Sequence, residues 1–136
     1  MTRGAVHHVE LWFADLPRAE RSWGWLLAAL DYEPTRRWAD GCAWSSAGAP
    51  GGTDVVLESG PDVLAAPHDR RRPGVNHLAF HAGTRADVDA LVRDAPAHGW
   101  TLLFADRHPH AGGPDHYAAY LEDGEGLEVE LVATTV

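Results

Sequence analysis

Histidines and carboxylates are the side chains of this chain with the most scope for chemistry. The 136 residues include nine His and twenty Asp plus Glu, whereas all eleven basic residues are Arg and the one cysteine is Cys42. Imidazoles and carboxylates together bind divalent metal ions. The absence of lysine excludes Schiff-base chemistry and a phosphate-loop lysine, and a single cysteine excludes an internal disulfide.

The charge balance and the apolar pattern limit the partners and the location. The formal net charge of −9 argues against a nucleic-acid or anionic-membrane partner. No apolar run approaches the length of a membrane span, and His7, His8 and Glu10 interrupt the first apolar stretch, which is therefore no signal-peptide core. We expect a cytoplasmic protein, because a lone free cysteine fits a reducing compartment.

An internal repeat organises these candidate residues. The segments Val6–Leu16 (VHHVELWFADL) and Val75–Arg85 (VNHLAFHAGTR) align with His8 on His77. Each reads as a short strand that ends in a helix-capping residue, and apolar residues at helical spacing follow in both halves. Two copies of one strand–helix unit are therefore predicted.

The ends of the two halves also match. The strands TDVVLESG (Thr53–Gly60) and GLEVELVA (Gly126–Ala133) align with Glu58 on Glu130. Two weaker strands are predicted between helix and closing strand in each half, at 35–38 and 42–46 and then at 101–105 and 117–121. We therefore predict one α+β domain over 1–136, made of two βαβββ modules at about 5–60 and 74–134 joined by a linker at 61–73.

The repeat brings four candidate ligands to equivalent places. A pseudo-twofold relation between the modules would bring His8, His77, Glu58 and Glu130 to one cavity, cupped by mixed β-sheet. Such a nitrogen and oxygen set suits Ni²⁺, Co²⁺, Fe²⁺, Mn²⁺ or Zn²⁺ with open positions for a substrate. The side-chain period of two also places Glu10 on the face of His8.

The chain resembles the vicinal oxygen chelate superfamily, which includes glyoxalase I, extradiol dioxygenases, fosfomycin-resistance enzymes and bleomycin-binding proteins. The resemblance extends from His7 to Ala133 and is carried by HHVELWFADLPRAERSWGWLL, NHLAF and YLEDGEGLEVELVA. Gly124 stands where the closing turn of that superfamily usually has Pro. The resemblance implies metal ligands at His8, His77 and Glu130, with Glu130 preferred to Glu128.

The role of Glu58 has two readings in this superfamily. Glyoxalase-like members carry a fourth ligand at its position, whereas fosfomycin enzymes use two His and one Glu. A loop at 106–120 (DRHPHAGGPDHYAAY) resembles the stretch of extradiol dioxygenases in which a His and a Tyr assist oxygen chemistry, which implicates His108 and Tyr120. A further second-sphere His of those enzymes has no counterpart, because Thr53 and Asp54 occupy that region.

These patterns predict a glyoxalase-like, divalent-metal-dependent enzyme of the lyase or isomerase kind. The metal acts as a Lewis acid on a small oxygen-chelating substrate, and Glu58 or Glu10 is the candidate base. The alternatives are an Fe²⁺-dependent extradiol-type dioxygenase and a metal-free, bleomycin-resistance-like protein that sequesters a drug. Short two-module chains of this superfamily often pair, so a homodimer is predicted.

Overall fold

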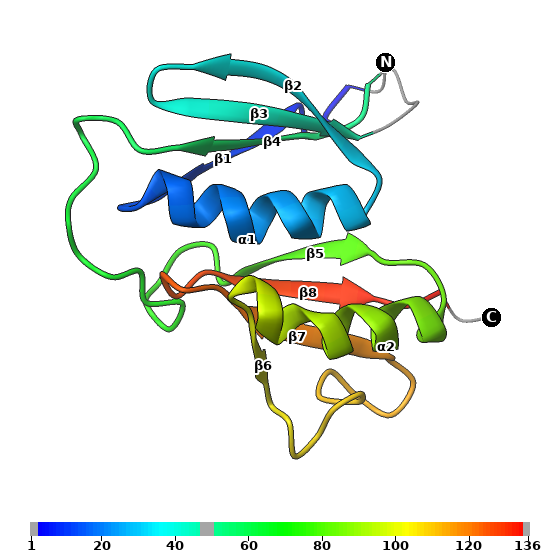
Figure 1. The fold of residues 1–136 in the computed structure, drawn as a ribbon. Helices are drawn as coiled ribbons and strands as arrows, with labels where there is room; N and C mark the ends of the chain where they lie inside the picture. The colour runs from blue at the N-terminus through cyan, green and yellow to red at the C-terminus, as the bar shows by residue number, and fades with distance from the viewer. Residues whose placement is uncertain (1–2, 47–50, 135–136) are drawn as a thin grey trace. The chain divides into compact units, whose positions relative to one another are not determined.

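A computed structural model describes residues 3–46 and 51–134 of the chain, which divides into two compact units, residues 1–66 and 67–136. Each unit is one βαβββ module with one four-stranded mixed sheet, so the α+β fold and the two modules predicted from the repeat are confirmed (Figure 1). In the described residues, no helix is long and apolar enough to cross a membrane.

The first module begins with strand β1 (His8–Trp12) and helix α1 (Leu16–Ala29), and continues with β2 (Tyr32–Trp38), β3 (Gly41–Ser46) and β4 (Asp54–Glu58). The strand order is β1-β4-β3-β2, with β1 and β4 parallel. Asp15 caps α1 by accepting a hydrogen bond from the Arg18 backbone, as the sequence predicts. The side chains of α1 that pack into the core include Trp23, Leu26 and Leu27, all fully buried.

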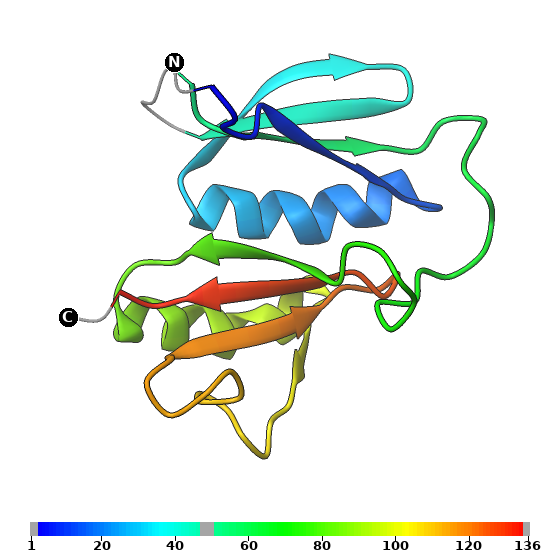
Figure 2. The same cartoon turned by 180° about the vertical axis from the view of Figure 1, so that it is seen from behind.

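The second module repeats this order with β5 (His77–His81), α2 (Arg85–Asp94), a 3₁₀ turn (Ala95–His98), β6 (Thr101–Leu103), β7 (Ala118–Glu122) and β8 (Glu128–Val132). Its sheet order is β5-β8-β7-β6, the same topology as in the first module (Figure 2). Thr84 and Asp87 form a capping box at the start of α2, and Gly99, in a left-handed conformation, ends the 3₁₀ turn.

The two faces of each sheet carry different side chains, apolar on one face and largely polar on the other, and this determines where functional side chains can lie. In each module, a helix packs against one face, and alternate strand residues such as Val55 and Leu57 or Val129 and Leu131 are buried. The intervening residues, including His8, His77 and Glu130, project from the opposite face because side chains alternate along a strand. The candidate ligands of each module therefore belong to the face that its helix leaves open.

Candidate functional site

In the second module, His77 and two glutamates share the open face of the sheet. Strands β5 and β8 are parallel neighbours that pair His77 with Glu128 and Ala79 with Glu130. Because Val129 and Leu131 point into the core, Glu128 and Glu130 point the other way, next to His77. The alternating sequence EVELV thus places two carboxylates beside one imidazole.

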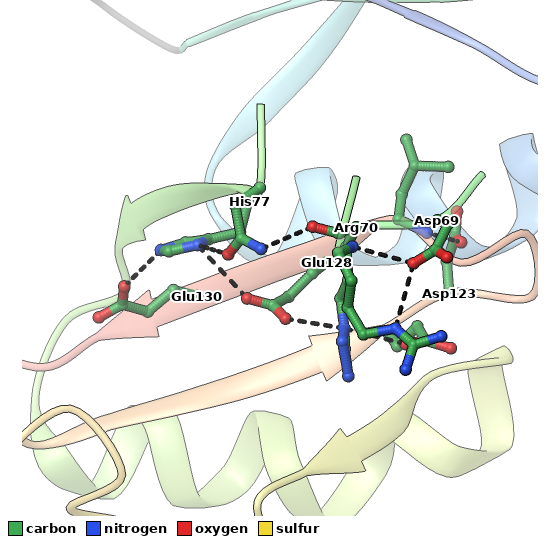
Figure 3. A network of polar contacts seen from close by, with 10 residues as sticks. Asp69, Arg70, His77, Asp123, Glu128 and Glu130 are labelled. Atoms are coloured by element: carbon green, nitrogen blue, oxygen red, sulfur yellow. Dashed lines mark hydrogen bonds and ion pairs between the residues drawn. The ribbon is translucent and has the colours of Figure 1, made fainter. Parts of the chain in front are cut away.

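The imidazole of His77 lies between these two carboxylates (Figure 3). Its Nε2 is 3.0 Å from Oε1 of Glu130, and its Nδ1 is 3.3 Å from Oε2 of Glu128. Each glutamate thus contacts a different ring nitrogen.

The two glutamates differ in their other partners. The second oxygen of Glu128 is 3.0 Å from Nε of Arg70, and the Glu128 side chain is almost fully buried. Burial raises the pKa of the Glu128 carboxyl above its usual range, while the charges of His77 and Arg70 act in the opposite direction. Glu128 is thus paired with the guanidinium of Arg70, whereas no guanidinium contacts Glu130 among the described residues, so Glu130 stays the preferred candidate ligand.

Tyr120 and His116 complete the surroundings of Glu130. Tyr120 pairs with Glu130 across β7 and β8, and its ring centroid is 5.9 Å from that of His77 in an edge-on arrangement. Burial and the Glu130 carboxylate raise the pKa of the Tyr120 phenol, which favours the protonated form. Nε2 of His116 is hydrogen bonded to Oε2 of Glu130.

His116 is a residue that the sequence analysis did not single out. It ends the loop in which His108 was the candidate, and this loop folds back on itself through main-chain hydrogen bonds such as Ala118 N to Pro109 O at 3.0 Å. A Cβ at Gly112 would lie 2.6 Å from the Tyr120 hydroxyl and 2.7 Å from Cδ2 of His116, so glycine allows the loop to pack on both. No local spacing separated His116 from the other loop histidines, because His108 and His110 also lie an even number of residues before Tyr120.

In the first module, a depression of about 330 Å³ lies on the open face of the sheet. It is lined by His7, His8, Glu10, Arg36, Trp38, Asp54, Val56 and Glu58. The predicted site residues His8, Glu10 and Glu58 are therefore brought to one hollow. His7 precedes the first strand and lines the same hollow, its Nδ1 being 2.9 Å from Nδ1 of His8.

Two tryptophans hold the carboxylates of this depression. Trp12 donates its indole N–H to Oε2 of Glu10 at 2.7 Å, and Trp38 donates to Oε1 of Glu58 at 3.4 Å. The guanidinium of Arg36 lies 5.8 Å from the centre of the Trp38 ring. The hollow thus combines acidic groups with aromatic surface, which suits a small polar molecule with a planar part.

The strand register separates Glu58 from the place that Glu130 occupies. Strand β1 pairs His8 with Asp54, Glu10 with Val56 and Trp12 with Glu58. In the second module, Glu130 lies two residues after Glu128, the direct partner of His77. The corresponding residue of the first module, two after the direct partner of His8, is Val56. Glu58 lies four residues along the strand from the row of His8, which corresponds to about 13 Å. The alignment of Glu58 with Glu130 in the sequence is therefore not reproduced by the strand pairing.

The spacing of His77 and Glu130 fits a metal ion. Two ligands bound at about 2.1 Å and at a right angle to each other lie about 3 Å apart. The distance of 3.0 Å between Nε2 of His77 and Oε1 of Glu130 is that of a hydrogen bond, and it is also close to this value. Over residues 3–46 and 51–134, however, no group of three or more His, Cys, Asp or Glu side chains is arranged to hold a metal ion. The second module brings two of the predicted ligands, His77 and Glu130, into direct contact.

Comparison with known proteins identifies the family. The model of the Glyoxalase/Bleomycin resistance protein/Dioxygenase superfamily matches residues 7–120, and the chain belongs to this superfamily. This agrees with the resemblance in the sequence.

Three relatives illustrate the similarity. YqjT of Bacillus subtilis (strain 168), a protein of uncharacterised function, is 39% identical over 132 residues, which cover 94% of this chain and 98% of YqjT. A Bacillus halodurans structure, provisionally described as a glyoxalase, is 39% identical with a TM-score of 0.87 and 97% of each chain covered. The fosfomycin resistance protein FosX of Listeria monocytogenes, solved with Mn(II) and sulfate, has 19% identity and a TM-score of 0.64 over 100% of this chain and 96% of FosX, and this shows the fold alone.

Proposed function

We propose that the protein is a divalent-metal-dependent enzyme of glyoxalase-like type that acts on a small substrate bound through two oxygen atoms. The observation that carries this proposal is the 3.0 Å spacing of His77 Nε2 and Glu130 Oε1, which suits adjacent ligands of one metal ion. FosX, which has a similar fold, was solved with Mn(II), and this supports the choice of a divalent metal ion for the proposal.

The proposed ligands are His77 and Glu130 of the second module and His8 of the first. His8 occupies in β1 the place that His77 occupies in β5, on the open face of its sheet. A bound divalent ion would supply Lewis-acid stabilisation of negative charge that develops on the substrate oxygens. Two imidazoles and one carboxylate leave coordination positions open for those oxygens.

We assign Glu58 the role of the base. It lies in the same depression as His8 but several residues along the strands, which leaves room for a substrate between the ligand and the base. Trp38 fixes one oxygen of Glu58, so the other oxygen can accept a proton from the substrate. Glu10, held by Trp12, is the alternative base.

A second candidate function is supported by the groups around Glu130. Tyr120 and His116 both flank this carboxylate, and a His and a Tyr beside a two-His-one-carboxylate set would also serve Fe²⁺-dependent oxygenation of a catechol. The two functions differ in their need for Fe²⁺ and dioxygen, so they are separated by experiment.

Metal binding by the full-length protein, purified without a chelating tag, is the first test. Titration calorimetry with Mn²⁺, Ni²⁺ and Zn²⁺ should give one site per chain for the wild type, and His77→Ala and Glu130→Gln should abolish it. His81→Ala is the matched control, because His81 is exposed on the same face of β5 but contacts neither glutamate. Equal binding by all variants would refute the site.

Turnover assays then separate the reactions. The wild type loaded with Ni²⁺ or Zn²⁺ should isomerise a hemithioacetal or a related substrate with two chelating oxygens, without oxygen uptake. Oxygen consumption with a catechol, seen with Fe²⁺ only, would favour the dioxygenase instead. The drug-sequestering alternative would be supported if the wild type bound none of these metals and an aromatic drug quenched the protein's tryptophan fluorescence on binding.

A further inference from the structure

The Nδ1 side of His77 is held by a second set of polar contacts that the ligand assignment does not use (Figure 3). Oδ1 of Asn76 is 2.6 Å from Nδ1 of His77, and Oε2 of Glu128 is 3.3 Å from the same nitrogen. Both partners are oxygens, so the ring nitrogen between them must be the donor. The contacts therefore require a proton on Nδ1.

The orientation of the Asn76 side chain is fixed by its other end. Its Nδ2 donates a hydrogen bond of 2.9 Å to the main-chain carbonyl oxygen of Arg70. A carbonyl oxygen accepts and cannot donate, so the amide nitrogen faces Arg70 and the amide oxygen faces His77. The asparagine is thereby set as an acceptor for the imidazole.

The side chain of Arg70 holds the other acceptor. Its Nε is 3.0 Å from Oε1 of Glu128 and 3.3 Å from Oε2 of Glu122. This contact engages one oxygen of Glu128 and leaves the other directed at His77. Arg70 therefore orients both acceptors of His77, one through its carbonyl group and one through its guanidinium group.

The segment that carries Arg70 is itself packed against the second module. Gly126 has a φ of 91°, and a Cβ there would overlap the carbonyl oxygen of His68. The close approach of these two main chains places Arg70 over the start of β8, and only 21% of its side chain is exposed. A charged run that the sequence suggested as a connector thus contains an anchored arginine.

We propose that Asn76 and Glu128 are positioning residues that keep the proton of His77 on Nδ1, and that Arg70 holds both of them in place. The consequence for metal binding rests on the proposed function: Nε2 also faces an acceptor, Oε1 of Glu130 at 3.0 Å, but with a proton fixed on Nδ1 it is the proton on Nε2 that a metal ion would displace. Nothing in this arrangement uses Glu128 as a ligand.

The first test needs no metal. A long-range ¹H–¹⁵N spectrum of the metal-free wild-type protein should show His77 protonated at Nδ1, including at a pH where the ring is neutral. Asn76→Ala should lose this preference, whereas Glu128→Gln, which keeps an acceptor oxygen, should retain most of it. An unprotonated Nδ1 in the wild type would overturn the proposal.

The second test measures Zn²⁺ affinity by calorimetry on the same full-length variants. Asn76→Ala should weaken Zn²⁺ binding by about 10- to 100-fold, the usual effect of removing a partner of a ligating histidine. Glu122→Gln is the matched control, because Glu122 contacts Arg70 but not His77, and it should keep the wild-type affinity. Far-UV circular dichroism verifies that each variant is folded.

The two proposals fail differently. A wild type that binds no Zn²⁺ but carries the His77 proton on Nδ1 refutes the proposed function and supports the positioning role. A wild type that binds Zn²⁺ with His77 through Nδ1 refutes the positioning role and supports a metal site. Equal Zn²⁺ affinity of the wild type and Asn76→Ala also overturns the positioning role.

Discussion

His116 is hydrogen bonded through Nε2 to Oε2 of Glu130, the carboxylate oxygen that His77 does not contact. Glu130 is therefore held at both oxygens by imidazoles from two different segments, strand β5 and the loop before β7. A carboxylate ligand that is fixed in this way needs less reordering when a metal binds. His116 would thus orient Glu130, the proposed metal ligand.

Replacing His116 by Ala should weaken Mn²⁺ or Zn²⁺ binding by about tenfold, because Glu130 loses its fixed orientation. His108→Ala provides the matched control in the same loop, since the structure gives His108 no contact with Glu130 comparable to that of His116. Calorimetric titration of both variants is the measurement. A loss with His108→Ala and none with His116→Ala would contradict the orienting role of His116.

Glu58 and Glu10 can be separated by their effects on turnover and on metal binding. If Glu58 is the base, Glu58→Gln should keep one metal ion per chain and lower kcat by about 100-fold or more, in line with the usual contribution of a general base. Glu10→Gln should change kcat far less. Metal content is measured by elemental analysis. Loss of metal from Glu58→Gln would instead make Glu58 a fourth ligand, as the sequence first indicated.

The topology and the faces of the strands could be predicted from the sequence, whereas the register could not. The repeat of His8 and His77 and the alternation EVELV depend on local chemistry with a period of two, which a sequence displays directly. Which residue of β4 pairs with His8 depends on how two distant segments slide past each other. The sequence alignment would place Glu58 opposite Glu10, whereas the structure pairs Glu10 with Val56.

Residues brought in by loops were missed for a related reason. Arg70 lies in a run of three arginines, and a sequence does not say which one a loop turns inward. In the structure, Arg70 turns inward and contacts Glu128, whereas the side chain of Arg71 is mostly exposed. His116 was similarly hidden among three loop histidines, because long-range packing on Glu130 and not local spacing determines its place.

Cys42 should be unreactive in the folded protein. Its side chain is buried in the core of the first module, and burial, with a smaller effect from Glu20, raises the pKa of the thiol to about 11. This leaves about 100-fold less thiolate at neutral pH than an ordinary cysteine has, so labelling by a disulfide reagent should be slow until denaturant is added. Rapid stoichiometric labelling of the native protein would contradict this environment.

The same thiol should make stability depend on alkaline pH. The folded pKa of Cys42 lies above that of the unfolded chain, so the folded state retains a proton that the unfolded state releases. This contribution is complete below about pH 9 and is lost as the pH rises toward about 11. Urea unfolding of wild type and Cys42→Ala at pH 8 and pH 10.5 should show a smaller fall in the variant. A parallel fall in both would assign the alkaline instability to other groups.

We predict a twofold-symmetric homodimer, because the candidate ligands are divided between two modules that each leave one sheet face open. The ligands of one site then come either from both modules of one chain or from the first module of one chain and the second module of its partner. Sedimentation of the wild type at micromolar concentration measures the assembly, and a strict monomer would refute the dimer.

Mixing His8→Ala with His77→Ala chains decides between the two arrangements. If ligands are exchanged between chains, each mixed dimer has one site with both histidines intact and one site that lacks both. Equal mixing makes half of the dimers mixed, so about a quarter of all sites should regain metal. If each site lies within one chain, every site keeps one damaged histidine and no metal returns. Native mass spectrometry of differently tagged chains verifies that the subunits exchange. If they exchange and no metal binding returns, all ligands of a site belong to a single chain.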